Sequence, residues 1–143
     1  MTRVAGTIGA FDLLHVGHVR FLQACRAQCD YLKVGLGADA TCERSKQRRP
    51  VIDEEQRMEM LRALRCVDEV RLFTPGLDNT EATADWIAAW QVDLIFVSEE
   101  WRAGPRWSRL EPALAQRGIA VAYLPYTEGV STSAIKARIR AGA

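Results

Sequence analysis

The sequence has almost no excess of charge of either sign and no long hydrophobic run. Its 143 residues include 19 lysines and arginines against 18 aspartates and glutamates, which leaves a formal net charge of +1. This balance provides no general basic field for a nucleic acid or a membrane surface, so any anion site has to be built locally. No apolar stretch approaches the roughly 20 residues that cross a bilayer, and the first residues lack the apolar core of a signal peptide. We therefore expect a cytoplasmic protein with no nucleic-acid partner and no membrane partner.

Cysteine and histidine are scarce, which limits the metal sites that side chains can form. The four cysteines have no C-x-x-C spacing; they are Cys25, Cys29, Cys42 and Cys66. Such thiols are typically buried and unpaired in a reducing compartment, and a metal role is the less favoured alternative. The two histidines, His15 and His18, would need a third zinc ligand, for which Asp12 is poorly spaced. We therefore predict no metal site formed by side chains.

Internal repeats, linkers and low-complexity segments are also absent from the sequence. The chain length suits one domain, and two independent cores would be difficult to form within it. Hydrophobic residues make up 48% of the chain and charged residues 26%, a balance typical of a packed core. We therefore expect a single domain over residues 1–143.

The sequence does contain a regular alternation of two patterns. Short apolar stretches predict buried strands at Arg3–Gly9, Tyr31–Gly37, Asp68–Phe73, Asp93–Ser98 and Ile119–Pro125. Apolar residues at helical spacing predict helices at Val16–Cys29, Asp53–Cys66, Thr80–Gln91, Arg109–Gly118 and Ser131–Arg140. The polar and basic segment Cys42–Pro50 predicts a loop.

Strands that alternate with helices predict an α/β fold. We expect a Rossmann-like parallel sheet of about five strands with helices on both faces. Ligands of such sheets bind beyond the carboxyl ends of the strands, where the strand order reverses. This rule selects four segments as candidate binding loops: residues 9–18, 37–50, 98–107 and 126–133.

The first of these segments holds both histidines of the chain. Gly9 closes the first expected strand, and His15 to His18 open the first expected helix. Free N–H groups at a helix N-terminus attract anions and disfavour a histidine cation, so both imidazoles should be neutral donors. Gly17 leaves space beside the backbone for a bulky anion. Phosphate binding, ordinary hydrogen-bonded histidines and metal ligation all remain open on these residues alone.

Two separated motifs resemble those of a known superfamily. The segment GAFDLLHVGH resembles the H-x-G-H signature of nucleotidyltransferases, and TEGVSTSAIK (Thr127–Lys136) resembles their second signature. Between them, DYLKVGL, SKQRRP, EEQRMEMLRALRCVDEV and VSEEW follow in the order seen in glycerol-3-phosphate cytidylyltransferases. The segment SKQRRPVIDEEQR is also similar to archaeal FAD synthetases and heptose-phosphate nucleotidyltransferases. The resemblance covers nearly the whole chain, which implies one nucleotidyltransferase domain.

The resemblance implies a reaction between two phosphate compounds. A phosphomonoester, or a phosphonate, attacks the α-phosphorus of a nucleoside triphosphate and releases pyrophosphate. CTP and glycerol 3-phosphate are the pair that the motif order favours. Phosphocholine, phosphoethanolamine, a sugar phosphate or FMN are alternative acceptors, and adenylyl transfer is the alternative to cytidylyl transfer. The family also implies Mg²⁺ held by the substrate and a homodimer, whose interface in the family includes the segment around Arg65.

This chemistry requires positioned cations and donors and no general base. The attacking phosphate, with a second pKa of about 6, is already ionised at pH 7. By resemblance, His15 and His18 would contact the triphosphate and stabilise the transition state. Lys46 would contact both substrates from a mobile loop, Thr127 would join the catalytic group, and Arg57 would contact the acceptor.

The resemblance places the remaining site residues around the nucleotide. They are Gly9, Ala10, Phe11, Asp12, Gly17, Glu100, Trp101, Tyr126, Ser131, Thr132 and Ser133. The backbone of the first three would pass close to the α-phosphate, and Asp12 would orient neighbouring donors or the metal ion. The three hydroxyl residues, at a helix N-terminus, would bind the β- and γ-phosphates together with Thr127. Glu100 and Trp101 occupy the position of the base and ribose pocket.

Two positions depart from the family pattern near the triphosphate. Ala10 stands where threonine is usual, and Tyr126 stands where an arginine precedes Thr127. The second change removes a fixed cation from the site. Candidate replacements are Arg48, Arg49, Arg102 and Arg106. These departures keep open a second class of function, a nucleotide-binding module without turnover.

Overall fold

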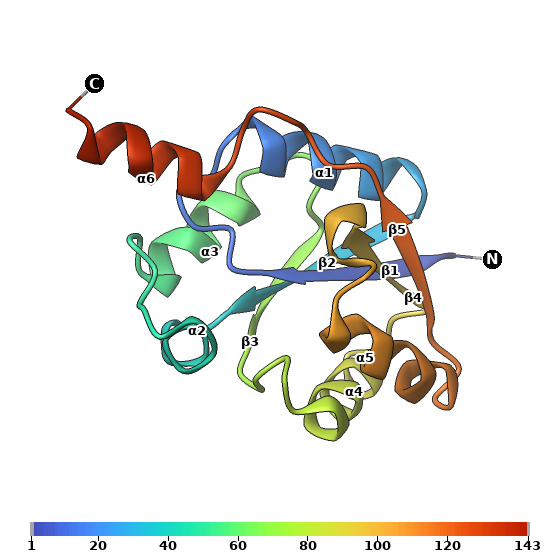
Figure 1. Ribbon diagram of the computed structural model, residues 1–143. Coiled ribbons are helices and arrows are strands. Elements are labelled where there is room, and N and C mark those ends of the chain that lie inside the picture. The colour runs from blue at the N-terminus through green and yellow to red at the C-terminus, as the bar shows by residue number, and fades with distance from the viewer. Residues whose placement is uncertain (1, 143) are drawn as a thin grey trace.

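Five parallel strands form the centre of the molecule. The computed structural model describes residues 2–142. The strands are β1 (Val4–Gly9), β2 (Tyr31–Gly37), β3 (Glu69–Phe73), β4 (Leu94–Ser98) and β5 (Ala120–Leu124). They form one sheet in the order β3-β2-β1-β4-β5, and every pair of neighbours is parallel (Figure 1). The expected Rossmann-like sheet is therefore confirmed.

Helices cover both faces of this sheet. They are α1 (Val16–Ala27), α2 (Asp39–Lys46), α3 (Glu54–Arg62), α4 (Thr80–Ala89), the short 3₁₀ helix η1 (Glu99–Trp101), α5 (Pro105–Ala115) and α6 (Thr132–Arg140). On one face, Leu22 of α1 and Leu61 of α3 join one apolar cluster with the strands. On the other face, Ile87 of α4 and Leu110 of α5 join a second cluster. No helix within residues 2–142 is long and apolar enough to cross a membrane.

Two helices differ from the sequence-based expectation. About half of the expected loop Cys42–Pro50 belongs to helix α2. Asp39 anchors the start of this helix: its N–H donates to Glu54 Oε1 at 2.8 Å, and its carboxylate accepts the Glu54 N–H at 3.2 Å. Helix α5 begins at Pro105, earlier than expected, since proline at the first helical position loses no needed donor. Pro112 lies inside this helix, whose apolar side is held by packing against α4.

The cysteines are thiols, as expected. All four are unpaired, three are buried and Cys66 is partly buried. Burial raises the pKa of each thiol, so all four are protonated at neutral pH.

The strand order reverses beside β1. The chain runs outward from β1 through β2 to β3, and then returns to the other side of β1 to form β4 and β5. The crevice at the carboxyl ends of β1 and β4 is therefore the position where a Rossmann-like sheet binds its ligand.

Candidate active site

The loop between β1 and α1 is held in an uncommon backbone conformation. Phe11 and Leu13 both have positive φ, 49° and 52°, which side chains other than glycine rarely adopt. Asp12 lies between them and is buried. Its carboxylate accepts hydrogen bonds from the N–H groups of Leu13 (3.1 Å), Val51 (2.7 Å) and Ile52 (2.9 Å). These bonds stabilise the loop and fix it to the segment that precedes α3.

The two histidines cap helix α1, and backbone N–H groups fix the protonation of both rings. The His15 N–H donates to Nδ1 of His18 at 3.2 Å, and the Gly17 N–H donates to Nδ1 of His15 at 3.1 Å. Each Nδ1 therefore uses its lone pair, and the hydrogen-bond network assigns the proton of each neutral ring to Nε2. The site presents two Nε2–H donors at a helix N-terminus.

Packing keeps both rings neutral at pH 7. The imidazoles stack with centroids 3.8 Å apart, and Phe11 contacts His18 edge to face at 5.4 Å. Burial lowers the pKa of His15. The pKa of His18 falls to about 4, chiefly through burial and then through repulsion from His15, while Asp12 opposes the shift. These neutral donors match the expectation drawn from the helix N-terminus.

Gly17 is required for the position of the His15 ring. A Cβ at residue 17 would lie 2.9 Å from Cε1 and 3.0 Å from Nδ1 of His15. The space that we expected to admit an anion is therefore filled by the imidazole, which folds back over the glycine to accept its N–H. The same Cβ would lie 3.8 Å from Cβ of Thr127, so the second motif begins beside the first.

Helix α6 brings the second motif to the β1–α1 loop. Ser131 caps the helix by accepting the Ala134 N–H at 3.0 Å. The Thr132 hydroxyl donates to the carbonyl oxygen of Asp12 at 2.9 Å, across 120 positions of sequence. The first turns of α1 and α6 consequently adjoin the same loop (Figure 1). Of the three hydroxyl residues, Thr132 is engaged within the protein, and Ser133 is exposed.

The family of the chain follows from this pair of motifs and from comparison with known proteins. Residues 7–138 match the family model described as cytidylyltransferase-like. The chain belongs to the cytidylyltransferase-like family. This result confirms the expected class of enzyme, a nucleotidyltransferase, and supports the family as a whole rather than the glycerol-3-phosphate cytidylyltransferases in particular.

Curated relatives of this cytidylyltransferase-like chain are longer proteins. The bifunctional protein HldE of Hyphomonas neptunium is 35% identical over 142 residues, which are 98% of this chain and 28% of that protein. HldE of a Bradyrhizobium species is 53% identical over 73 residues, or 50% of this chain and 15% of the relative. Nearly all of this chain therefore aligns with the Hyphomonas protein, but it spans less than a third of that protein's length.

A solved structure has the same fold. The lipopolysaccharide core biosynthesis protein from Thermoplasma volcanium superposes with a TM-score of 0.67 at 22% identity. The match covers 89% of this chain and 98% of that one.

Arg57 lies inside the cytidylyltransferase-like domain and not on its surface. Its side chain is fully buried. The guanidinium donates to the carbonyl oxygens of Ile52 (2.8 Å), Ala10 (2.7 Å) and Gly37 (3.0 Å), and to the Asp39 carboxylate at 2.6 Å. The direct contact with an acceptor that the resemblance implied does not fit this burial. Arg57 instead joins the carboxyl ends of β1 and β2 to the start of α3.

Other expected site residues reach the same edge of the sheet from separate elements. Lys46 ends α2, Glu100 and Trp101 lie in η1 beyond β4, and Tyr126 lies between β5 and α6; all four are exposed. Within residues 2–142, no hydrogen bond or ion pair joins any of them to either histidine. Their roles stay predictions.

Two of the four candidate replacements for the missing arginine, Arg102 and Arg106, are engaged elsewhere. Arg102 lies over the Tyr123 ring at 4.5 Å and pairs with Glu99 at 3.4 Å. Arg106 pairs with Asp78 at 3.2 Å. Neither side chain is therefore free in this conformation to supply a cation beside Tyr126.

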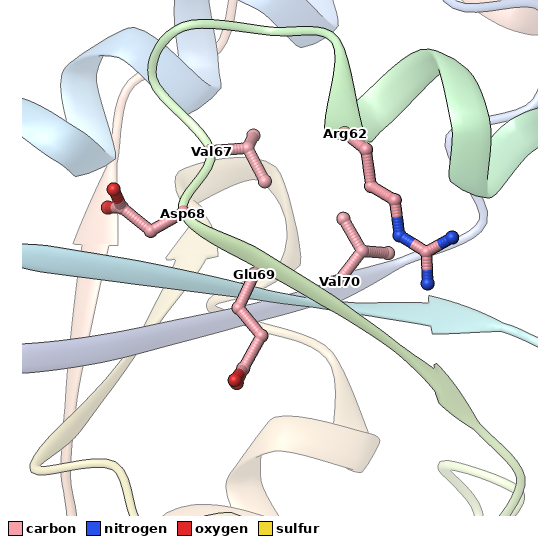
Figure 2. Close-up of a pocket in the computed structure, with 5 residues that line it drawn as sticks. All are labelled: Arg62, Val67, Asp68, Glu69 and Val70. Carbon is pink, nitrogen blue, oxygen red and sulfur yellow. The ribbon is translucent and has the colours of Figure 1, made fainter.

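One open pocket lies away from the candidate site. It has a volume of about 360 Å³ and is lined by Arg62 and by residues 67–70, at the beginning of β3 (Figure 2). The amino ends of parallel strands lie opposite the edge that carries the two motifs. This pocket is therefore not the nucleotide site.

Proposed function

We propose that the chain transfers a nucleotidyl group from a nucleoside triphosphate to the phosphate of a sugar phosphate, with release of pyrophosphate. Support for the acceptor class comes from the similarity of SKQRRPVIDEEQR to heptose-phosphate nucleotidyltransferases and from the HldE relatives. Support for the reaction comes from the shared loop: two imidazole donors and the first turns of α1 and α6 adjoin Asp12.

The histidine pair carries the proposal. In this reaction the sugar phosphate oxygen attacks the α-phosphorus, the bond to the β-phosphate oxygen breaks, and negative charge grows on the equatorial oxygens and on the departing pyrophosphate. Neutral Nε2–H donors strengthen their hydrogen bonds as this charge grows, which favours the transition state over the bound substrate. The attacking phosphate is already ionised, so its oxygen needs no base.

Mg²⁺ enters this proposal with the triphosphate. No group of three histidine, cysteine, aspartate or glutamate side chains within residues 2–142 is arranged to hold a metal ion. Both carboxylate oxygens of Asp12 already accept backbone N–H groups, which fits an orienting role better than a ligand role. The residues present therefore fit an ion held by the substrate phosphates, where it would neutralise their charge.

CTP and glycerol 3-phosphate form the second candidate pair. The order of the intermediate motifs favours it, and the same site chemistry serves both acceptors. A homodimer remains part of the proposal through the family resemblance, and light scattering of the purified chain measures it directly.

Pyrophosphate release tests the proposal. Each of CTP, ATP, GTP and UTP is mixed with Mg²⁺ and, in turn, with glycerol 3-phosphate, hexose and heptose 1-phosphates, phosphocholine and FMN. The proposal is supported if pyrophosphate is released with a sugar phosphate and if His15→Ala abolishes this release. Release with glycerol 3-phosphate alone favours the second candidate. Triphosphate binding without release across the whole panel would instead indicate a nucleotide-binding module.

A further inference from the structure

A second pocket borders the candidate site. It has a volume of about 320 Å³ and lies between the β1–α1 loop, the segment that joins α2 to α3, and helix α6. Figure 1 shows α6 extending from the sheet on the side where α2 and α3 lie. Seven residues line the pocket, four of them cationic and three apolar.

The cations are concentrated here in a chain that is nearly neutral overall. They are Arg48, Arg49, Lys136 and Arg140, and no carboxylate lines the pocket with them. Lys136 lies 4.0 Å from the Asp12 carboxylate, and Arg49 pairs with Glu43 at 3.1 Å. Within residues 2–142, neither Arg48 nor Arg140 forms an ion pair. Two guanidinium groups are therefore available to an anion.

Apolar side chains form the rest of the wall. Val51 is 63% exposed and Ile139 is 64% exposed, and Leu13 lies beside them. Large aliphatic side chains left in water next to free cations favour a ligand with a carbon skeleton and an anionic end. A bare inorganic ion would use the cations and leave this apolar surface exposed.

The pocket shares a wall with the candidate site. The Asp12 carboxylate accepts the N–H of Val51, a pocket residue, and faces Lys136, while its carbonyl accepts the Thr132 hydroxyl. Along α6, Lys136 is one turn from Thr132 and Arg140 is two turns away, roughly 12 Å at 1.5 Å per residue. Arg140 thus lies too far along the helix to hold the same phosphate as the first turn.

We propose that this pocket binds a second anionic group of the acceptor, a phosphate or carboxylate remote from the phosphate that attacks the triphosphate. The inference rests on the proposed function and narrows its substrate to a sugar that carries two anionic groups. The sugar ring lies against Val51 and Ile139, and the remote anion lies between Arg48 and Arg140. Bidentate guanidinium contacts to phosphate provide the selectivity.

Calorimetry with two probes tests this assignment without any turnover. Glucose 1,6-bisphosphate and glucose 1-phosphate are titrated into the unmodified chain and into three variants, Arg140→Ala, Arg48→Ala and Arg138→Ala. Arg138 is a matched control because it is exposed on the same helix and does not line the pocket. We expect the bisphosphate to bind about tenfold more tightly than the monophosphate, since a hydrogen bond to a charged group contributes that much.

Arg140→Ala should remove the preference for the bisphosphate without lowering the affinity for the monophosphate. Arg138→Ala should retain the preference. Equal affinity for the two probes, or a preference that persists in both Arg140→Ala and Arg48→Ala, would overturn the assignment. If Arg138→Ala also loses the preference, the preference arises from the overall positive charge of the helix and not from the pocket, which would overturn the assignment too. Failure of the proposed function is read separately, as absence of pyrophosphate release with every pair of substrates.

Discussion

The imidazole rings of His15 and His18 stack with their centroids 3.8 Å apart and their planes inclined by 23°. Each ring accepts one backbone N–H at Nδ1, so each carries its proton on Nε2, and neither Nε2–H has a hydrogen-bond partner within residues 2–142. Two imidazolium ions would repel one another at this separation, and burial already disfavours charge on both rings. The pair therefore supplies neutral donors whose hydrogen bonds strengthen when a polyphosphate gains charge beside them.

Loss of one donor should slow the reaction far more than it weakens the fold. His15→Ala is expected to lower kcat by about 10²- to 10³-fold, the usual effect of removing one preorganised donor. It should cost about 1 kcal/mol of stability, because His15 also caps α1. Asn79→Ala is the matched control, since Asn79 caps α4 and is not a site residue. Pyrophosphate release and thermal melting measure both effects, and a His15→Ala enzyme with full kcat would contradict the assignment.

Gly17→Ala should separate activity from stability. Alanine favours a helix over glycine by roughly 0.5–1 kcal/mol, yet its Cβ would displace the His15 ring. We expect little change in thermal stability, because the displaced ring also loses its cap on α1 and so offsets the helix gain. The loss of kcat should be at least about tenfold, as for a donor moved out of position. In a His15→Ala background the same change should have no further effect on kcat. Additive losses in the double variant would show that the glycine acts by another route.

Acid should weaken the fold through His18. The folded-state pKa of about 4 lies below the ordinary value of 6.5, so protons bind the unfolded chain preferentially. The stabilisation that depends on neutral His18 is fully present above pH 6.5 and is lost as the pH falls from 6.5 toward 4. Urea denaturation at pH 7 and pH 5 should show an extra loss of about 1 kcal/mol relative to His18→Asn, after allowance for the partly exposed ring. The Asn amide oxygen keeps the acceptor for the His15 N–H, and equal losses in both chains would refute the shift.

Removal of the buried Arg57 guanidinium should lower the free energy of unfolding, whether or not this residue contacts the acceptor. Arg57→Ala leaves the Asp39 carboxylate buried without its 2.6 Å partner and three carbonyl oxygens without their donor. Breaking such a pair typically costs about 3–5 kcal/mol. Arg62→Ala, on the exposed side of the same helix, should change the free energy of unfolding by less than about 0.5 kcal/mol. Urea titration compares the two, and a similar small effect at both positions would contradict the positioning role.

The sequence predicted the sheet and its helices well because their signals are local. Asp53, the first residue of the helix expected over Asp53–Cys66, caps α3, and alternation of apolar segments identified all five strands. Helix α2 was missed because its buried side includes Asp39 and Thr41, which are held by hydrogen bonds and give no apolar periodicity.

Within the site, motif spacing identified the histidines but not what surrounds them. No local pattern reveals that Gly17 lies under an imidazole, that Arg57 is buried, or that Val51 donates to Asp12 from 39 positions away. These relationships depend on tertiary contacts between segments that the sequence keeps apart.

The most direct test of the central claim is a long-range ¹H–¹⁵N spectrum of the two imidazoles. The chain contains two histidines, so every imidazole signal belongs to His15 or His18. At pH 7 we expect both rings to be neutral with the proton on Nε2, and both Nε2 signals to shift when a non-hydrolysable triphosphate analogue is added. A proton on Nδ1 in either ring, or Nε2 signals that stay unmoved while calorimetry shows the analogue bound, would contradict the account.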